Sequence, residues 1–161
     1  MKGDANMSTR NIPMTLPLDK DGFLRRECPN CRRQFKWLPT EGETSGQPQS
    51  QYYCPYCGKP AGINAWWTKE QVQYAKQLTA AKVIGPELEK FAKDVKQLNR
   101  PGSLVRFETK YKRPSKPPPL HEPDDMRKVV PPCHPNEPLK IHEDWNKPVF
   151  CLICGKSFSS D

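Results

Sequence analysis

Short apolar runs separated by turn-forming residues mark the first part of the chain. Residues 23–27 and 35–38 each carry aromatic and aliphatic side chains, and residues 51–53 read Gln-Tyr-Tyr. Runs of this length and composition predict three short strands. Residues 39–50 are dominated by Thr, Glu, Gly, Ser, Gln and Pro, the composition of an exposed loop. We therefore expect the second and third strands to form a hairpin around this loop.

The spacing of apolar residues becomes helical in the middle of the chain. Thr68 and Gln71 have the form of a capping box, and the apolar residues after them recur at helical spacing. Gly85-Pro86 predicts a break, and a second helix should then run to Pro101-Gly102. We expect the two helices to pack against each other or against the strands, although an apolar stripe can also bind a partner. The stripe on the second helix consists of Leu88, Phe91, Ala92, Val95 and Leu98.

The last third of the chain returns to short apolar stretches. Residues 103–109 alternate like a strand and lead into a basic, proline-rich tract at 110–119, where a packed sheet cannot continue. This tract predicts an extended, semi-rigid linker. Further on, residues 139–142 and 149–150 predict the two arms of a hairpin that turns at residues 143–147.

Four cysteines beside the first strands carry the clearest chemistry. Cys28 and Cys31, and then Cys54 and Cys57, form two C-x-x-C pairs. We call each such pair, with the turn that carries it, a knuckle. One knuckle can aim two sulfurs at an ion about 2.3 Å away, and two knuckles complete the tetrahedral ligand set of a structural zinc site. Gly58 follows the second knuckle, where a positive φ would let backbone amides reach the sulfurs.

The C-terminal part repeats half of this arrangement. Residues 151–156 have the same C-x-x-C-G-K form as residues 54–59, while a Cys-His pair stands where the other knuckle would be. His142 is an alternative to the histidine of that pair, because adjacent ligands are awkward, but an extended strand would hold His142 about 10 Å from the knuckle. The two sites together use all seven cysteines. We predict that the second zinc site consists of Cys133, His134, Cys151 and Cys154.

The two knuckles at Cys28, Cys31, Cys54 and Cys57, with the Pro and Gly residues around them, resemble the zinc-ribbon superfamily over about forty residues. The resemblance implies a hairpin clamped by zinc and identifies a fold group rather than one function. We expect a small metal-stabilised α+β protein with an N-terminal zinc ribbon, a central helical pair and a C-terminal second zinc-ribbon-like module. The expected segments are a flexible leader (1–18), the zinc ribbon (19–66), a helical segment (67–100), a strand and basic Pro-rich linker (101–128) and the second zinc-binding module (129–161).

Composition favours small metal-held units over one large core. The chain has 161 residues and 19 prolines, and its mean hydropathy of −0.86 is too low for a single large core. It has no apolar run long enough to cross a membrane, and its start lacks the apolar segment of a secretory signal. Seven cysteines, most of them in C-x-x-C pairs, suit metal binding in a reducing compartment. We therefore expect a cytoplasmic protein without membrane contact.

The sequence disfavours catalysis. Four protein ligands would close each zinc site to water and substrate. The sequence shows no Ser-His-Asp constellation, no phosphate-binding Gly-rich loop and no dinucleotide fingerprint. We expect a protein that is not an enzyme and has no small-molecule substrate. Electron transfer is a further alternative, because paired knuckles with C-P-x-C-G at the second also resemble rubredoxin, whose four thiolates hold iron.

The charge of the chain suggests an acidic partner. The formal net charge is +8, and it would fall to about +5 if seven thiolates bound two Zn²⁺ ions. The alternative to nucleic acid is a protein partner, with the chain acting as an adaptor subunit of a larger complex through its ribbons and helical stripe. Cations flank the first knuckle, and we predict a basic edge that binds DNA or RNA through Arg25, Arg26, Arg32, Arg33 and Lys36.

Overall fold

The computed structural model describes residues 12–39, 50–99, 101–102 and 104–159. Most of the predicted leader and of the predicted loop at 39–50 therefore lies outside the described residues. The chain forms two compact units. The first, which we call the sheet unit, consists of residues 16–72 and 119–161. The second, the helical unit, consists of residues 73–118 together with the N-terminal segment that ends at Thr15.

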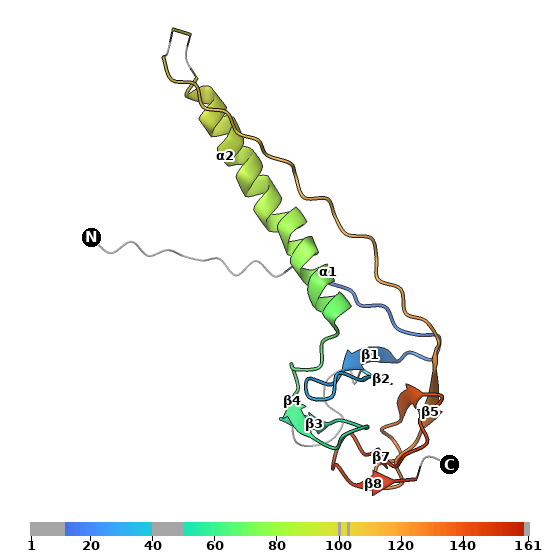
Figure 1. The fold of residues 1–161 in the computed structure, drawn as a ribbon. Coiled ribbons are helices and arrows are strands. Elements are labelled where there is room, and N and C mark those ends of the chain that lie inside the picture. Colours follow the sequence, from blue (N-terminus) through green and yellow to red (C-terminus); the bar gives the residue numbers. More distant parts are fainter. Residues whose placement is uncertain (1–11, 40–49, 100, 103, 160–161) are drawn as a thin grey trace, which may run out of the picture. The chain divides into compact units, whose positions relative to one another are not determined.

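A four-stranded antiparallel sheet forms the centre of the sheet unit (Figure 1). Strand β2 pairs with β6 through Lys36 with Lys140 and Trp37 with Leu139, so the sheet joins segments about a hundred residues apart. The predicted zinc ribbon and the predicted second module thus share one sheet. In spatial order the strands are β1 (Leu24–Glu27), β2 (Gln34–Trp37), β6 (Leu139–His142) and β5 (Met126–Val129).

Two short hairpins each enclose one knuckle. Strand β3 (Gln51–Tyr53) pairs with β4 (Pro60–Gly62), and β7 (Val149–Phe150) pairs with β8 (Ser157–Phe158). The two hairpins predicted from the sequence are wrong, since within the described strands β2 does not pair with β3, nor β6 with β7. A knuckle brings its own flanking residues together, and closing so short a loop costs less entropy than closing the loop of residues 38–50 that the first predicted hairpin required.

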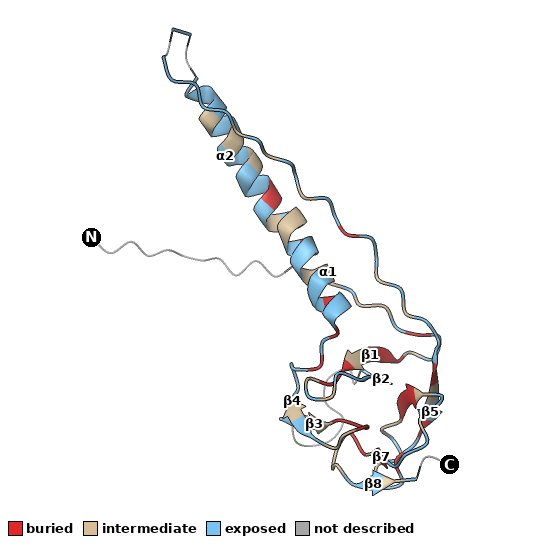
Figure 2. Cartoon of the chain, viewed as in Figure 1, coloured by how far each residue is buried: buried red, intermediate tan, exposed pale blue. Residues whose placement is uncertain are grey.

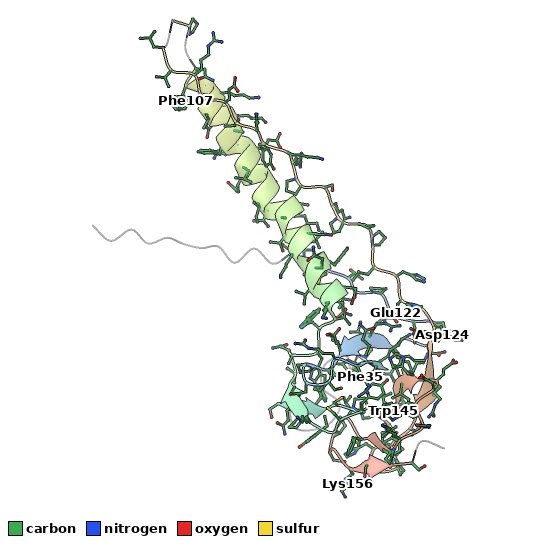
Figure 3. All side chains as sticks on the ribbon, in the orientation of Figure 1. Phe35, Phe107, Glu122, Asp124, Trp145 and Lys156 are labelled. Carbon is green, nitrogen blue, oxygen red and sulfur yellow. The ribbon has the colours of Figure 1, made fainter. Side chains whose placement is uncertain are left out.

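One face of the four-stranded sheet carries the apolar core. Phe35 (labelled in Figure 3) is fully buried, and its ring meets that of Trp66 edge to face at 5.7 Å between centroids. Trp37, Leu139 and Ile141 are buried in the same cluster. Each aromatic or aliphatic side chain removed from water in this way contributes about 1.5–3 kcal/mol.

The opposite face carries a row of four cations. Cross-strand pairing sets Arg25 opposite Lys36, Lys36 opposite Lys140, and Lys140 opposite Lys128. Like charges placed opposite each other on a sheet repel. Repulsion matters most for the two central lysines, because Lys36 and Lys140 are only 0% and 2% exposed.

Carboxylates from two distant segments neutralise three of these cations, Arg25, Lys36 and Lys140. Asp19 accepts hydrogen bonds from Lys140 at 2.7 Å and from Lys36 at 3.3 Å. Glu122, on the segment leading into β5 (Figure 3), lies 2.9 Å from both Lys36 and Arg25. The charged face therefore ties the chain before β1 and the chain before β5 to the same sheet.

These contacts determine the ionisation of the buried groups. Burial acts to raise the pKa of Asp19, but hydrogen bonds from Lys140, from the amides of Phe23 and Asp21, and from Lys36 outweigh it and lower the pKa to about 2. Burial likewise acts to lower the pKa of Lys140, and the surrounding carboxylates, led by Asp19, raise it above the usual lysine value. Asp19 and Lys140 are thus ionised throughout the neutral range.

A continuous helical stretch follows the sheet unit's first segment. The predicted capping box is confirmed, because the Thr68 and Gln71 amides each donate to the other's side-chain oxygen at 3.1 Å. The predicted break at Gly85-Pro86 is wrong. A π-helical turn precedes it, in which the Gly85 amide donates to the Ala80 carbonyl, and Pro86 occupies the first turn of the next segment, where a missing N–H is tolerated. The elements are α1 (Lys69–Thr79), η1 (Ala80–Ile84) and α2 (Gly85–Gln97).

Residues 104–118 of the helical unit have no helix or strand, and we call them the return segment. The Asn99 side chain exchanges two hydrogen bonds with the Phe107 backbone, at 2.9 and 2.8 Å, and Tyr111 donates to the Gly85 carbonyl at 2.9 Å. The strand predicted at 103–109 is wrong for its described residues, none of which lies in a strand. The linker predicted at 110–119 is extended, as expected.

The apolar stripe of α2 stays largely uncovered. Because α1, η1 and α2 form one continuous stretch, they cannot pack on each other as predicted. Figure 2 shows most of this stretch as exposed, and Phe91 and Leu98 are each 62% exposed. None of the helices in the described part of the chain is long and apolar enough to cross a membrane.

Replacing Asp19 with Asn should destabilise the sheet unit by about 2 kcal/mol or more at pH 7, because two buried lysines lose their shared carboxylate. The folded pKa of about 2 lies below the unfolded value of 3.8. The ionised group therefore stabilises the fold fully above about pH 4 and ceases to do so as the pH falls toward 2. Urea unfolding followed by tryptophan fluorescence should give the same difference from wild type at pH 7 and pH 5.

The exposed Asp144→Asn variant is the matched control, and it should unfold like wild type. If the effect of D19N shrank between pH 7 and pH 5, Asp19 would not be the ionised centre of this cluster.

Candidate metal centres

Three knuckles share one backbone conformation. In each, the amide of the first cysteine donates to the carbonyl five residues later, and the amide four residues later donates back, all at 2.9–3.0 Å. The residue four positions after the first cysteine takes a positive φ, +66° at Gly58 and +70° at Gly155, which confirms the prediction for Gly58. Arg32 adopts the same conformation, at +62°, in the first knuckle, where a non-glycine residue is strained by about 1 kcal/mol. The knuckles are Cys28–Arg33, Cys54–Lys59 and Cys151–Lys156.

The first centre brings Cys28, Cys31, Cys54 and Cys57 together, with all four sulfurs within 4.8 Å of one another. The Sγ atoms of Cys28 and Cys57 are 3.8 Å apart, and those of Cys31 and Cys54 are 3.7 Å apart. Four sulfurs at the vertices of a tetrahedron around a zinc ion should lie about 3.8 Å apart. The group therefore has the dimensions of a four-thiolate metal site.

Backbone amides surround the sulfurs of this centre. The Asn30 and Cys31 amides donate to the Cys28 sulfur and the Tyr56 amide to the Cys54 sulfur, each at 3.4 Å. Even so, burial raises the pKa of the Cys54 thiol well above its usual value, more than hydrogen bonds from the Cys57 and Tyr56 amides lower it. A cation between the sulfurs would reverse this balance, because metal ligands must be thiolates.

The second centre consists of Cys133, His134, Cys151 and Cys154, whose ligand atoms also lie within 4.8 Å. The Cys133 and Cys154 sulfurs are 3.4 Å apart, and the Cys151 sulfur is 3.4 Å from Nδ1 of His134. Sulfur and nitrogen ligands of one tetrahedral zinc should be about 3.6 Å apart. The structure thus brings three cysteines and one histidine into a second potential metal site.

The structure separates the two candidate histidines. His134 reaches the sulfurs from a tight turn, in which its amide donates to the Pro131 carbonyl at 3.1 Å. His142 instead stacks on the ring of Tyr56, at 6.0 Å between centroids, and its amide donates to the Tyr56 hydroxyl at 3.0 Å. Within the described residues, His134 alone of the two joins the second group of ligands.

The second centre is the more exposed of the two. Cys133 is exposed, whereas Cys28 and Cys54 in the first centre are fully buried. Burial raises the pKa of the Cys151 thiol to about 12. For Cys154 the raising effect of burial is outweighed by hydrogen bonds from the Lys156 amide and the neighbouring thiols, which lower its pKa. A metal at this centre would be easier to reach from solvent.

The two centres contact each other through equivalent parts of their knuckles. The Tyr53 amide donates to the Leu152 carbonyl, and the Phe150 amide donates to the Pro55 carbonyl, both at 2.9 Å. A Cβ at Gly58 would lie 3.0 Å from the Phe150 ring, and one at Gly155 would lie 2.7 Å from the Tyr53 ring. The aromatic residue before each knuckle thus packs on the glycine that ends the other.

A third group of possible ligands has a different explanation. Asp19, Asp21 and Asp124 lie within 4.8 Å of one another. The ammonium of Lys140 sits among them, at 2.7, 2.5 and 3.2 Å from their oxygens. A protein cation already neutralises this acidic group, so we do not interpret it as a metal site.

The structure does not assemble the five predicted nucleic-acid-binding cations into one edge. Arg25 and Lys36 are held in ion pairs with Glu122 and Asp125. Of the other three, two lie over the faces of aromatic rings and one has an exposed side chain. Arg26 lies over the rings of Trp37 and Trp67, Arg33 lies over Trp145, and Arg32 is 3.7 Å from Glu27 with an exposed side chain.

Comparisons with known proteins assign no family to the chain. No model of a protein family, no curated protein and no solved structure matches it. The geometry alone supports a small α+β protein with two groups of ligands able to hold metal ions, an arrangement consistent with zinc-ribbon-like modules.

Removing a ligand should affect the two centres unequally. Cys54→Ser should unfold the sheet unit, because it removes a ligand from the buried centre and metal-binding energy is folding energy there. Cys133→Ser, at the exposed centre, should lower the metal content from about two ions to about one per chain and leave the near-ultraviolet circular dichroism largely intact. Elemental analysis measures the metal content of each variant. A C54S protein that stays folded with two ions would contradict the prediction that metal holds the core together.

Gly155→Ala should destabilise the sheet unit by about 2–4 kcal/mol, because the methyl group meets both a positive φ and the Tyr53 ring. Gly22→Ala is the matched control, since Gly22 has φ +83° and nothing within 4 Å of its Cβ position. It should cost only about 1 kcal/mol. Equal losses for both variants in urea unfolding would show that the contact between the knuckles does not contribute to stability.

Proposed function

We propose that the protein is a non-catalytic zinc protein that binds nucleic acid. In this proposal two structural zinc ions hold the sheet unit, and the helical unit supplies most of the contacts to phosphate. The observation that carries the proposal is the distribution of charge between the two units.

Zinc is the metal that the donor atoms favour. Thiolate and imidazole ligands with tetrahedral spacing are typical of structural zinc sites, and four protein ligands at each centre leave no position open for a substrate. A rubredoxin-like iron site would need four thiolates, which the second centre does not offer. Protein purified without added metal should be colourless and contain zinc, whereas a red protein containing iron would support the electron-transfer alternative.

Almost all of the net positive charge lies in residues 73–118. This segment contains 11 of the 26 Lys and Arg residues but only four of the 18 Asp and Glu residues, so it accounts for +7 of the net +8. The rest of the chain is nearly neutral, and seven thiolates with two zinc ions would make it negative. The segment most attracted to phosphate is therefore the helical unit rather than the first knuckle.

The cations of the return segment are available to a ligand. Lys110, Lys112 and Lys116 are exposed, and in the part of the chain that the structure describes they form no ion pair. Arg113 is 3.5 Å from Glu89, but an exposed pair of this kind is weak and readily exchanged. At about 3.3 Å per residue, Lys110 and Lys116 are about 20 Å apart along the extended chain, enough to follow several phosphates.

The exposed stripe of α2 supports a second candidate function, that of an adaptor. Ile84, Leu88, Phe91 and Leu98 are between 42% and 62% exposed. Large apolar side chains gathered on one helix are typical of a surface that docks another polypeptide. Binding through this stripe would depend little on salt concentration, which distinguishes it from binding to phosphate.

Replacing Lys110, Lys112 and Lys116 together with Gln should weaken binding of single-stranded RNA or DNA. Each lost phosphate contact should make the plot of log affinity against log salt concentration less steep. Losing all three should reduce the magnitude of its slope by about 2. Fluorescence anisotropy with a labelled oligonucleotide measures both quantities.

The control replaces three exposed lysines of the sheet unit, Lys59, Lys69 and Lys128, with Gln. It removes the same charge, and we expect a change in slope below 1. An equal change in slope in both variants would show that the lysines of the helical unit do not contact phosphate. If the protein bound neither RNA nor DNA at low salt, the proposed function would be wrong.

A further inference from the structure

A small cavity in the sheet unit lies outside both metal centres. Its volume is about 210 Å³, and strands β1, β2 and β3 contribute to its walls. Sites for drug-sized molecules usually measure about 300–1,000 Å³, so this cavity suits a single small group. Its lining includes Arg26, Trp37, Tyr52, Asn64 and Glu137.

Arg26 is the most unusual group in this lining. Its guanidinium lies 4.7 Å from the Trp37 ring centroid and 5.2 Å from that of Trp67. Its Nε is buried without a hydrogen-bond partner, and no carboxylate of the described residues pairs with the side chain. Burial lowers its pKa, and this outweighs the opposing effect of Tyr52. Buried cations in proteins are normally paired.

The neighbouring arginine shows what Arg26 lacks. Arg25 lies on the other face of β1 and donates to Glu122, Gln34 and Asp125 at 2.9, 3.2 and 2.5 Å. Arg26 instead lines a cavity, and its buried Nε has no hydrogen-bond partner, so a ligand with acceptor atoms could satisfy the guanidinium. A ligand in this cavity is therefore a candidate partner for Arg26.

The other walls restrict what this ligand can be. The rings of Trp37 and Tyr52 lie 4.9 Å apart between centroids, and Tyr52 is only half-buried, which leaves an aromatic surface for a flat group. Glu137 is half-buried and has no ion pair in the described residues. A simple anion such as phosphate, or the carboxylate of a peptide, would satisfy Arg26 but would be repelled by Glu137. The ligand must therefore carry acceptors and donors on a flat ring.

We propose that this cavity binds one unpaired guanine of a nucleic acid, an inference that rests on the nucleic-acid function proposed above. Arg26 donates to O6 and N7 of the base, the commonest pairing of arginine with guanine. Glu137 accepts from N1–H and the N2 amino group, and Tyr52 stacks on the ring. Adenine lacks O6, cytosine lacks N7 and uracil lacks an amino group, so each satisfies only part of this set.

The test compares labelled RNA strands of ten uridines, each with one central guanosine, adenosine or cytidine, by fluorescence anisotropy on the full zinc-loaded chain. The guanosine strand should bind about tenfold tighter than the others. Glu137→Gln should remove most of that preference without weakening the other strands. Arg26→Lys keeps the charge but loses the two-pronged donor edge, so it should also reduce the preference for guanosine.

Matched controls are Glu143→Gln and Lys128→Gln, which change exposed charges of the same unit and should leave the ratio between strands unchanged. Zinc content and circular dichroism identify any variant that fails to fold. If Arg26→Lys fails to fold, the result for E137Q decides the test. Equal affinity of wild type for all strands, or a preference that E137Q leaves intact, would overturn the guanine site while the nucleic-acid function stands.

If no RNA strand binds, the proposed function fails, and quenching of tryptophan fluorescence by free guanosine tests the cavity separately. Saturable quenching that is lost in E137Q would support the guanine site by itself. No quenching at millimolar guanosine would overturn it. Quenching by a short peptide with a free C-terminal carboxylate, but not by guanosine, would also overturn it and assign the cavity to a protein partner.

Discussion

Four cations lie in register across one face of the sheet, one from each strand, and the two central ones can be buried only if carboxylates meet them. Those carboxylates come from two segments about a hundred residues apart, represented by Asp19 and Glu122. An unpaired buried ammonium would cost several kcal/mol, so the charged face requires both segments to return to the sheet. The apolar face adds burial energy but is less selective, because many apolar segments could cover it.

The metal centres are built on the unit that this pairing closes. Tyr53 and Phe150 each pack on the glycine that ends the other's knuckle, so the two knuckles contribute to one packed unit. The sheet unit is nearly neutral in formal charge, and the helical unit carries most of the positive charge. In the function that we propose, the metal-held unit provides a rigid, selective surface, and the exposed lysines of the return segment provide affinity that is independent of sequence.

Local patterns were enough to predict the knuckles, the positive φ of Gly58 and the capping box at Thr68, because each depends on residues within six positions. Strand partners were mispredicted, since the pairing of β2 with β6 depends on contacts that no local pattern encodes. The ion pairs of Arg25 and Lys36 with Glu122 and Asp125 were missed for the same reason, because the carboxylates come from a segment about a hundred residues away. At Gly85-Pro86 the sequence signal for a break was real, but a π-helical turn accommodates the proline without ending the helical stretch.

The sheet unit is built from two separate stretches of the chain, and this has a consequence for the newly made protein. Ribosomes add about 5–20 residues per second, so β2 emerges about 5–20 seconds before the strand that pairs with it. During that interval the first four cysteines are already together in sequence and free to take up metal, while the outer edge of β2 has no neighbour and Lys36 and Trp37 have no partners from the later half. The nascent protein therefore passes through a half-built state with an open strand edge, the kind of surface on which chains mispair and to which chaperones bind.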